Sequence, residues 1–183
     1  MEPVILQSER LWLDQPTSAD RDRIVEYCRD PVFEAFMTLP WPYEPKHADF
    51  FVDELVPRGW QTETEFTWAL RESEGGPLLG AIGARTVGSD FGYWLGAPHR
   101  GRGLMSEAVA SVLHWLYDQG WPLVNWECVV GNRASAGIAR RNGFRYTGEA
   151  PTDLVFRDGS RPPAWHGVRS ATDDGTEKPG WPA

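Results

Sequence analysis

The stretch YWLGAPHRGRGLMSEAVASVLHWLY, residues 93–117, constrains the fold of this chain more than any other feature. A short apolar run ends at residues 96–98, and a loop of arginines and glycines follows at residues 100–103. A helical pattern starts directly after the loop, with four apolar residues on one face: Val109, Val112, Leu113 and Leu116. The sequence therefore predicts a strand that passes through this loop into a helix from Met105 to Gln119.

The loop and the start of the helix together suit an anionic ligand. Gly101 and Gly103 let the backbone approach a ligand closely and adopt angles that a side chain would block. The first N–H groups of the helix have no partner within it, and phosphate oxygens suit the position at which they point. Arg100 and Arg102 can add charge-assisted hydrogen bonds. We therefore expect a phosphate group at the mouth of this helix.

Two common phosphate loops do not match the pattern. No Gly-Lys-Ser/Thr is present, which excludes a Walker loop. The spacing from Gly101 and Gly103 to Ser106 lacks the third glycine of a dinucleotide fingerprint, and the preceding strand is far from the N-terminus. The pattern Arg-x-x-Gly-x-Gly/Ala does fit, with Arg100, Gly103 and then Met105. This loop resembles the acetyl-CoA pyrophosphate loop of the GNAT acyltransferase superfamily, although Met105 stands where many members carry Gly or Ala.

The resemblance extends over roughly residues 5–170. FGYWLGAPHRGRGLMSEAV and ECVVGNRASAGIARRNGF are similar to the two signatures of the RimJ/RimL-like branch, and SERLWLDQPTSAD and LPWPYEP resemble its opening segments. This resemblance implies an α/β GNAT acyltransferase fold. The expected central sheet is mixed and mostly antiparallel, is splayed at the cofactor site and has helices on both faces. We expect one N-acetyltransferase domain over residues 1–170. Short strands are predicted around residues 144–146, 154–157 and 165–169, and the polar, Gly/Pro-rich residues 171–183 are predicted to be a disordered tail.

The resemblance implies acetyl-CoA as co-substrate and a set of residues that contact it. By this resemblance, the backbone of Trp94 and Leu95 is expected to lie beside the pantetheine arm, and Asn132 to hydrogen-bond its amides. Asn132 is also a common helix cap, and Trp94 is equally suited to the core. The predicted cofactor-binding residues are Trp94, Leu95, Arg100, Gly101, Arg102, Gly103, Leu104, Met105, Ser106, Asn132 and Ser135.

The implied reaction is direct transfer of an acyl group from a thioester to a neutral amine. It needs a group to remove a proton, a group to stabilise the oxyanion and a group to protonate the sulfur. Ser135 is a candidate proton donor to the leaving thiolate, or a small residue in a first helical turn. Asp90 is a candidate base acting through water, or a solvated turn aspartate. Glu127 lies in a central strand and is a candidate base, a binder of the substrate ammonium, or half of a buried pair.

Four residues are candidates for the acceptor site by the same resemblance: Glu34, Trp41, Tyr43 and His166. Hydrophobic packing is the alternative for the aromatic residues, and a structural role is the alternative for the histidine. The four histidines and two cysteines show no ligand spacing, so no metal is predicted.

Composition narrows the partners. The formal net charge of −8 argues against nucleic acid and is compatible with a cationic acceptor. No apolar run approaches the ~20 residues that a membrane helix needs, so no membrane partner is expected. Two isolated cysteines favour a reducing cytoplasm. Exposed aromatic residues leave a homodimer open.

The sequence leaves the acceptor and two rival functions open. A protein N-terminus, a polyamine, an aminoglycoside-like drug and an amino acid all fit, and the donor is acetyl-CoA or another short acyl-CoA. One rival is a CoA-binding sensor or scaffold without turnover. The other is a nucleotide-binding protein that uses the same helix mouth.

Overall fold

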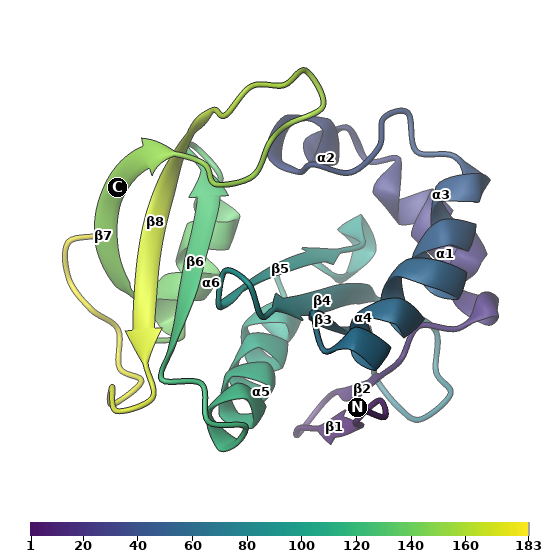
Figure 1. Cartoon of the computed structure of the whole chain (residues 1–183), viewed down its shortest axis with the longest axis horizontal. Coiled ribbons are helices and arrows are strands. Elements are labelled where there is room, and N and C mark those ends of the chain that lie inside the picture. Colours follow the sequence, from purple (N-terminus) through teal and green to yellow (C-terminus); the bar gives the residue numbers. More distant parts are fainter. Residues whose placement is uncertain (183) are drawn as a thin grey trace.

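The computed structural model describes residues 1–182, so the last residue of the predicted tail, Ala183, lies outside the described residues. Eight strands form one open sheet in the order β1-β2-β3-β4-β5-β6-β8-β7 (Figure 1). Only β5 and β6 are parallel, and the other neighbours are antiparallel. The strands are β1 (Leu6–Gln7), β2 (Trp12–Asp14), β3 (Glu65–Arg71), β4 (Gly80–Arg85), β5 (Asp90–Leu95), β6 (Leu123–Val129), β7 (Arg145–Pro151) and β8 (Pro163–Ser170).

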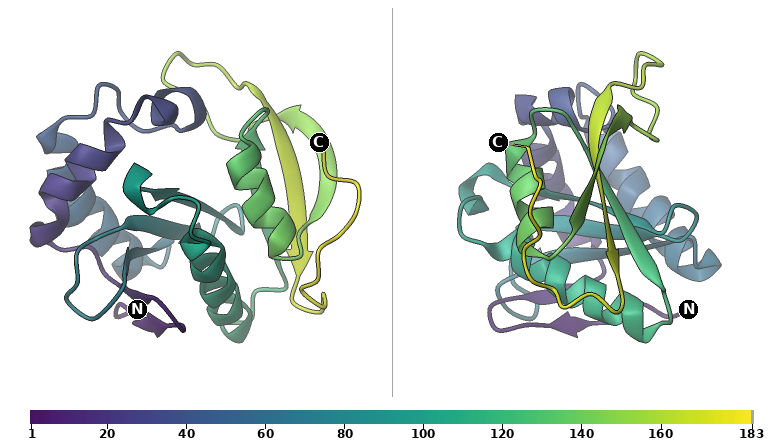
Figure 2. Two further views of the ribbon diagram at one scale, coloured as in Figure 1. Left: turned by 180° about the vertical axis from the view of Figure 1, so that it is seen from behind. Right: turned by 90° about the vertical axis from the view of Figure 1, so that its left-hand side faces the viewer.

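Helices cover both faces of the first part of the sheet (Figure 1). They are α1 (Arg21–Cys28), α2 (Pro31–Phe36), α3 (Pro45–Phe50), α4 (Val56–Thr62) and α5 (Leu104–Asp118). The last helix, α6 (Arg133–Arg141), lies against the second part of the sheet, beside β6 (Figure 2). Ile82 of β4 packs with α4 and α5 in one core, whereas its neighbour Ala81 packs with α1, α2 and α3 in a second core. Strands buried on both faces read as continuous apolar runs, which explains the pattern of β3 and β4. The predicted α/β class with a mixed, mostly antiparallel sheet is confirmed.

The two parallel strands separate soon after they meet. Asp90 and Asn125 are their one registered pair, and the Asn125 N–H donates to the Ser89 carbonyl at 2.6 Å. Beyond this point β6 continues to pair with β8 as far as Val129 and Ala164, whereas β5 stays with β4. The carboxyl ends of β5 and β6 therefore diverge, and backbone groups along their facing edges are left available to a ligand.

The segment between β7 and β8 differs from the prediction. A strand was expected at residues 154–157, but the chain leaves the sheet after Pro151 and forms a loop, residues 152–162. This loop crosses toward α2 (Figure 1), where Arg157 Nη1 and Nη2 donate to the backbone carbonyls of Glu34, Met37 and Leu39. The loop is thus tied to a distant helix rather than to the sheet; Leu154 and Phe156 are partly buried, and Val155 is exposed.

The C-terminal segment makes contacts that its polar, Gly/Pro-rich composition did not predict. Residues 171–182 return past α6, where Glu177 pairs with Arg140 at 3.4 Å (Figure 2). The ring of Trp181 lies 5.3 Å from that of Trp126, and its Nε1–H donates to the Phe144 carbonyl at 3.2 Å. None of the described helices is both long and apolar enough to cross a membrane.

Candidate active site

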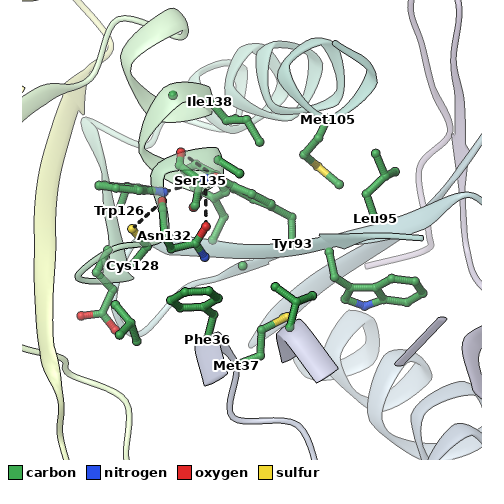
Figure 3. A pocket seen from close by; sticks show the side chains of 18 of the residues that line it. Phe36, Met37, Tyr93, Leu95, Met105, Trp126, Cys128, Asn132, Ser135 and Ile138 are labelled. Carbon is green, nitrogen blue, oxygen red and sulfur yellow. Dashed lines mark hydrogen bonds between the residues drawn. The ribbon is translucent and has the colours of Figure 1, made fainter. Parts of the chain in front are cut away.

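A cavity of about 650 Å³ lies where β5 and β6 diverge. Side chains enter it from several elements: Tyr93 and Leu95 from β5, Met105 from α5, Ser135 and Ile138 from α6, and Phe36 from α2 (Figure 3). The glycine loop and the first turn of α5 close one end, and the β7–β8 loop contributes Thr152, Leu154 and Phe156. The cavity therefore joins the phosphate-loop motif to segments that lie far from it in the sequence.

The glycine loop has the backbone that its sequence predicts. Gly101 and Gly103 have φ angles of 75° and 78°, in the left-handed region that residues with a side chain rarely adopt. A Cβ on Gly101 would meet no atom within 4 Å, so the backbone angle, and not crowding, requires glycine there. Gly103 is the N-cap of α5, so the free N–H groups of the first turn begin directly after it.

The two arginines of the loop have different surroundings. Arg100 lines the cavity; it donates to the Leu95 carbonyl at 3.0 Å, pairs with Asp30 at 2.8 Å and lies over the Phe33 ring. Arg102 is exposed, pairs with Glu72 and does not line the cavity. Only the first of the two predicted phosphate ligands thus faces the cavity.

The start of α6 forms a hydrogen-bonded group with β5. Asn132 caps the helix, because its Oδ1 accepts from the Ser135 N–H at 3.2 Å. The Ser135 Oγ lies 2.8 Å from the Tyr93 hydroxyl, and on its other side this hydroxyl accepts from the Trp126 Nε1–H at 3.4 Å (Figure 3). Burial raises the pKa of Tyr93 well above its usual range. Asn132 and Ser135 both line the cavity, as does Tyr93, which the sequence did not indicate.

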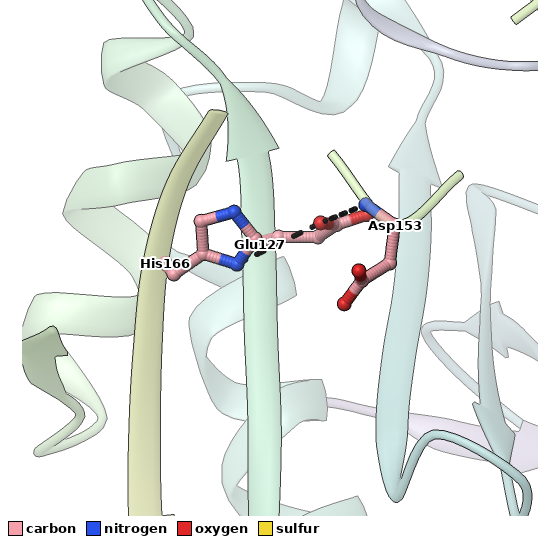
Figure 4. A group of neighbouring side chains, drawn as sticks. All are labelled: Glu127, Asp153 and His166. Atoms are coloured by element: carbon pink, nitrogen blue, oxygen red, sulfur yellow. Dashed lines mark hydrogen bonds and ion pairs between the residues drawn. The ribbon is translucent and has the colours of Figure 1, made fainter. Parts of the chain in front are cut away.

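Glu127 is a carboxylate held in one orientation at the cavity wall. Its Oε1 accepts from the Thr152 hydroxyl at 2.6 Å and its Oε2 accepts from the Asp153 N–H at 2.9 Å (Figure 4). His166 of β8 lies opposite Glu127 of β6, with its Nδ1 3.7 Å from Oε2. The ligand atoms of Glu127, Asp153 and His166 lie within 4.8 Å of one another, but such groups are common without an ion, and the trio alone does not indicate a metal.

The other predicted base lies elsewhere. Asp90 is at the beginning of β5, where the two parallel strands are still paired, and its Oδ1 accepts from Arg85 at 2.8 Å. It does not line the cavity, whereas Glu127 does. The structure thus separates two carboxylates that the sequence presents as equivalent.

The predicted acceptor residues lie around the cavity rather than in its lining. Glu34, Trp41 and His166 do not line it, and Tyr43 is buried in the core beneath α1 and α3. The cavity wall on this side is instead apolar: Phe36, Met37, Leu154 and Phe156. Glu34 contributes only its backbone carbonyl, which accepts a hydrogen bond from Arg157 and so helps to hold the β7–β8 loop against α2.

Some of the cavity residues that the sequence analysis did not name can be related to a weak sequence pattern. Tyr93 alternates with Trp94 along β5, so it must face away from the core in which Trp94 packs. Leu154 and Phe156 are likewise two residues apart, but this alternation predicts a strand. It does not indicate that the segment is a loop that reaches α2. The contacts of Arg157 span 118 to 123 residues, and no local pattern indicates them.

Comparison with known proteins identifies the family. Residues 10–145 match the acetyltransferase (GNAT) domain. The chain therefore belongs to the GNAT acetyltransferase family, and the family prediction is confirmed.

Particular relatives agree with the RimJ/RimL-like branch. The ribosomal-protein-serine acetyltransferase of Escherichia coli is 38% identical over 58 residues, which are 31% of this chain and 32% of that protein. The match thus spans about a third of the relative's length.

Two solved structures share the fold. The microcin C7 self immunity acetyltransferase MccE, in complex with acetyl-CoA and AMP, has a TM-score of 0.77 at 18% identity, covering 89% of this chain and 93% of that one. The ribosomal alpha-N-protein acetyltransferase RimL, whose coenzyme A forms a disulfide with a cysteine, has a TM-score of 0.77 at 17% identity, covering 91% and 98%.

Proposed function

We propose that this protein is an N-acetyltransferase that moves an acetyl group from acetyl-CoA to a primary amine by direct attack. One observation supports this function above the others: a single cavity connects the left-handed glycine loop, the diverging edges of β5 and β6, and a fixed carboxylate, Glu127. The first element suits a pyrophosphate, the second a chain of amides and the third an amine. These are the parts that the reaction needs, in one continuous space.

The donor would lie along β5 with its pyrophosphate at the glycine loop. The N–H groups of the first turn of α5 hold the phosphates, and Arg100 adds a charged contact. Backbone groups of Trp94 and Leu95, with Asn132, take the pantetheine amides. MccE was crystallised with acetyl-CoA, and RimL with coenzyme A bound to a cysteine. Cys128 lines this cavity beside Asn132, which supports a thioester sulfur near this point.

The chemistry is assigned to two side chains. We assign to Glu127 the orientation of the substrate ammonium and the acceptance of its proton. Two hydrogen-bond donors hold its carboxylate in one orientation at the cavity wall. The neutral amine then attacks the thioester carbon, the C–S bond breaks with its electron pair going to sulfur, and the second proton of the attacking nitrogen passes to the thiolate, which leaves the amide and free CoA. Ser135, at the start of α6, offers its hydroxyl to that sulfur.

A direct attack is favoured over an acyl-cysteine intermediate. Burial raises the pKa of Cys128 to about 12, so the thiol stays protonated near neutral pH. The thiolate, not the thiol, is the nucleophilic form of cysteine. We therefore expect a Cys128→Ala variant to keep turning over, with no acetylated enzyme detected by intact-protein mass spectrometry.

The acceptor is a primary amine with an apolar neighbour group. The acceptor end offers one carboxylate within an apolar wall that includes Phe36, Leu154 and Phe156. A protein N-terminus with an apolar first residue fits this description, and the names of the E. coli relative and of RimL point to ribosomal proteins as acceptors of those enzymes. A small cationic amine fits the net charge of −8.

The experiment has two stages. Titration calorimetry with coenzyme A tests the donor site, and ATP and NAD serve as comparison ligands. Release of free CoA from acetyl-CoA is then followed with N-terminal peptides, a polyamine, an aminoglycoside and amino acids, and the product is identified by mass spectrometry. Tight CoA binding without turnover on any amine would make the protein a CoA sensor or scaffold instead. Preference for ATP or NAD would overturn the proposal.

A further inference from the structure

The hydroxyl of Tyr93 lies inside the protein, between the indole of Trp126 and the first turn of α6. It is 3.4 Å from Trp126 Nε1 and 2.8 Å from Ser135 Oγ. An indole N–H can only donate, so the Tyr93 oxygen must accept on that side. The single hydrogen of Tyr93 is then free for an acceptor on the other side, toward Ser135.

Two oxygen atoms of Ser135 compete for this hydrogen. Oγ lies at 2.8 Å and the backbone carbonyl at 3.3 Å, so the shorter contact favours Oγ. When Oγ accepts from Tyr93, the hydrogen of Ser135 must point away from the tyrosine.

We propose that Tyr93 is a positioning residue that aims the Ser135 hydroxyl at the thioester sulfur. This inference rests on the proposed role of Ser135. Donors run in one direction, from Trp126 to Tyr93 to Ser135 and then to the sulfur, and each bond in such a chain strengthens the next. When the C–S bond breaks, the electron pair goes to sulfur, which accepts the Ser135 hydrogen bond. Tyr93 stays protonated throughout, since burial raises the pKa of its hydroxyl well above its usual range.

A merely structural role is the alternative, and the chain offers a matched control. The ring of Tyr93 stacks on Phe91 with 5.6 Å between centroids, so Tyr93→Phe keeps the packing and removes only the hydroxyl. Tyr117 is also half-buried, and its hydroxyl donates to the Arg169 carbonyl at 3.2 Å, away from the cavity lining. Tyr117→Phe therefore removes an equivalent hydrogen bond with no effect on the site.

The test is a kinetic cycle with Tyr93→Phe, Ser135→Ala and the double variant. We expect Tyr93→Phe to lower kcat about tenfold, the order of one lost hydrogen bond, with the acetyl-CoA KM little changed. Tyr117→Phe should keep the wild-type kcat at a similar melting temperature. The double variant should be no slower than Ser135→Ala, because Tyr93 acts only through Ser135.

Each contrary result has a different meaning. A normal kcat for Tyr93→Phe, when Ser135→Ala is slow, overturns the positioning role and leaves the proposed function intact. Additive losses in the double variant show that Tyr93 acts independently of Ser135, and they overturn it as well. A normal kcat for Ser135→Ala removes the serine from the mechanism, and the positioning role with it, while CoA binding and turnover still stand.

Discussion

The two ends of the cavity differ in the groups that form them: backbone groups at one end and side chains at the other. The end proposed for the acyl donor is mostly backbone: two left-handed glycines, the N-terminus of α5 and the free edge of β5, all within residues 90–106. The acceptor end is mostly side chains from α2, from β6 and from the β7–β8 loop. Arg157 holds two of these segments together through carbonyls that lie 118 to 123 residues away in the sequence.

This difference has a consequence for substitution. A backbone site depends on local conformation, so it is lost when the φ angles change and survives the loss of single side chains. A side-chain site depends on the position of a few groups, so it can be altered piece by piece. One end of the cavity is thus suited to a constant donor, and the other to acceptors that differ between relatives.

The largest effect is expected for Gly103→Val. A β-branched residue would be strained at a φ of 78° and would reach into the space proposed for the pyrophosphate. We expect the affinity for coenzyme A to fall about 10³-fold, the sum of strain and a displaced phosphate, while the fold persists. Titration calorimetry and a melting curve on one preparation measure both.

Gly120→Val is the matched control for the glycine loop. Gly120 follows α5 with a φ of 85°, and a Cβ there would meet no atom within 4 Å. The backbone strain is similar, but the residue does not line the cavity. Equal losses of CoA affinity in both variants would show that strain alone is responsible, and wild-type affinity of folded Gly103→Val would remove the loop from the donor site.

Glu127→Gln should have the next largest effect, at the acceptor end. Loss of a general base typically costs about 10²-fold or more, so we expect kcat/KM to fall by that order at neutral pH. The loss should shrink at high pH, where more of the amine is already neutral. Asp90→Asn changes a carboxylate that does not itself line the cavity, although its partner Arg85 does, so the pH–rate profile should change little. The reverse pattern would move the base to Asp90.

The same contrast explains what the sequence predicts and what it does not. The glycine loop, α5 and the order of β5, α5, β6 and α6 follow from local patterns, because each is set by neighbouring residues. The chain at residues 154–157 was wrongly predicted as a strand: the alternating residues Leu154 and Phe156 line the cavity, as Phe36 of α2 does, and the segment pairs with none of the described strands. The contact between Tyr93 and Ser135, and the contacts of Arg157, arise only when distant segments meet.

Arg157→Ala should act on the acceptor alone. Without its guanidinium, the β7–β8 loop loses its hydrogen bonds to the end of α2, and the apolar wall loosens. We expect the acceptor KM to rise roughly tenfold, because part of the cost of the three lost hydrogen bonds falls on acceptor binding, with the affinity for coenzyme A unchanged. Arg161→Ala, an exposed arginine of the same loop, is the control. An equal effect on coenzyme A would show that the two ends of the cavity are not independent.

The smallest effect is expected for Arg100→Gln, at the donor end. Arg100 already pairs with Asp30 and donates to the Leu95 carbonyl, so a phosphate must compete with existing partners. Exposed ion pairs contribute up to about 1 kcal/mol, so the affinity for coenzyme A should fall only about fivefold, and less at high salt. Arg102→Gln, outside the cavity lining, should leave it unchanged. Calorimetry at two salt concentrations measures both variants. If Arg100→Gln costs as much affinity as Gly103→Val, the pyrophosphate is held by charge rather than by the backbone, and the contrast between the two ends of the cavity fails.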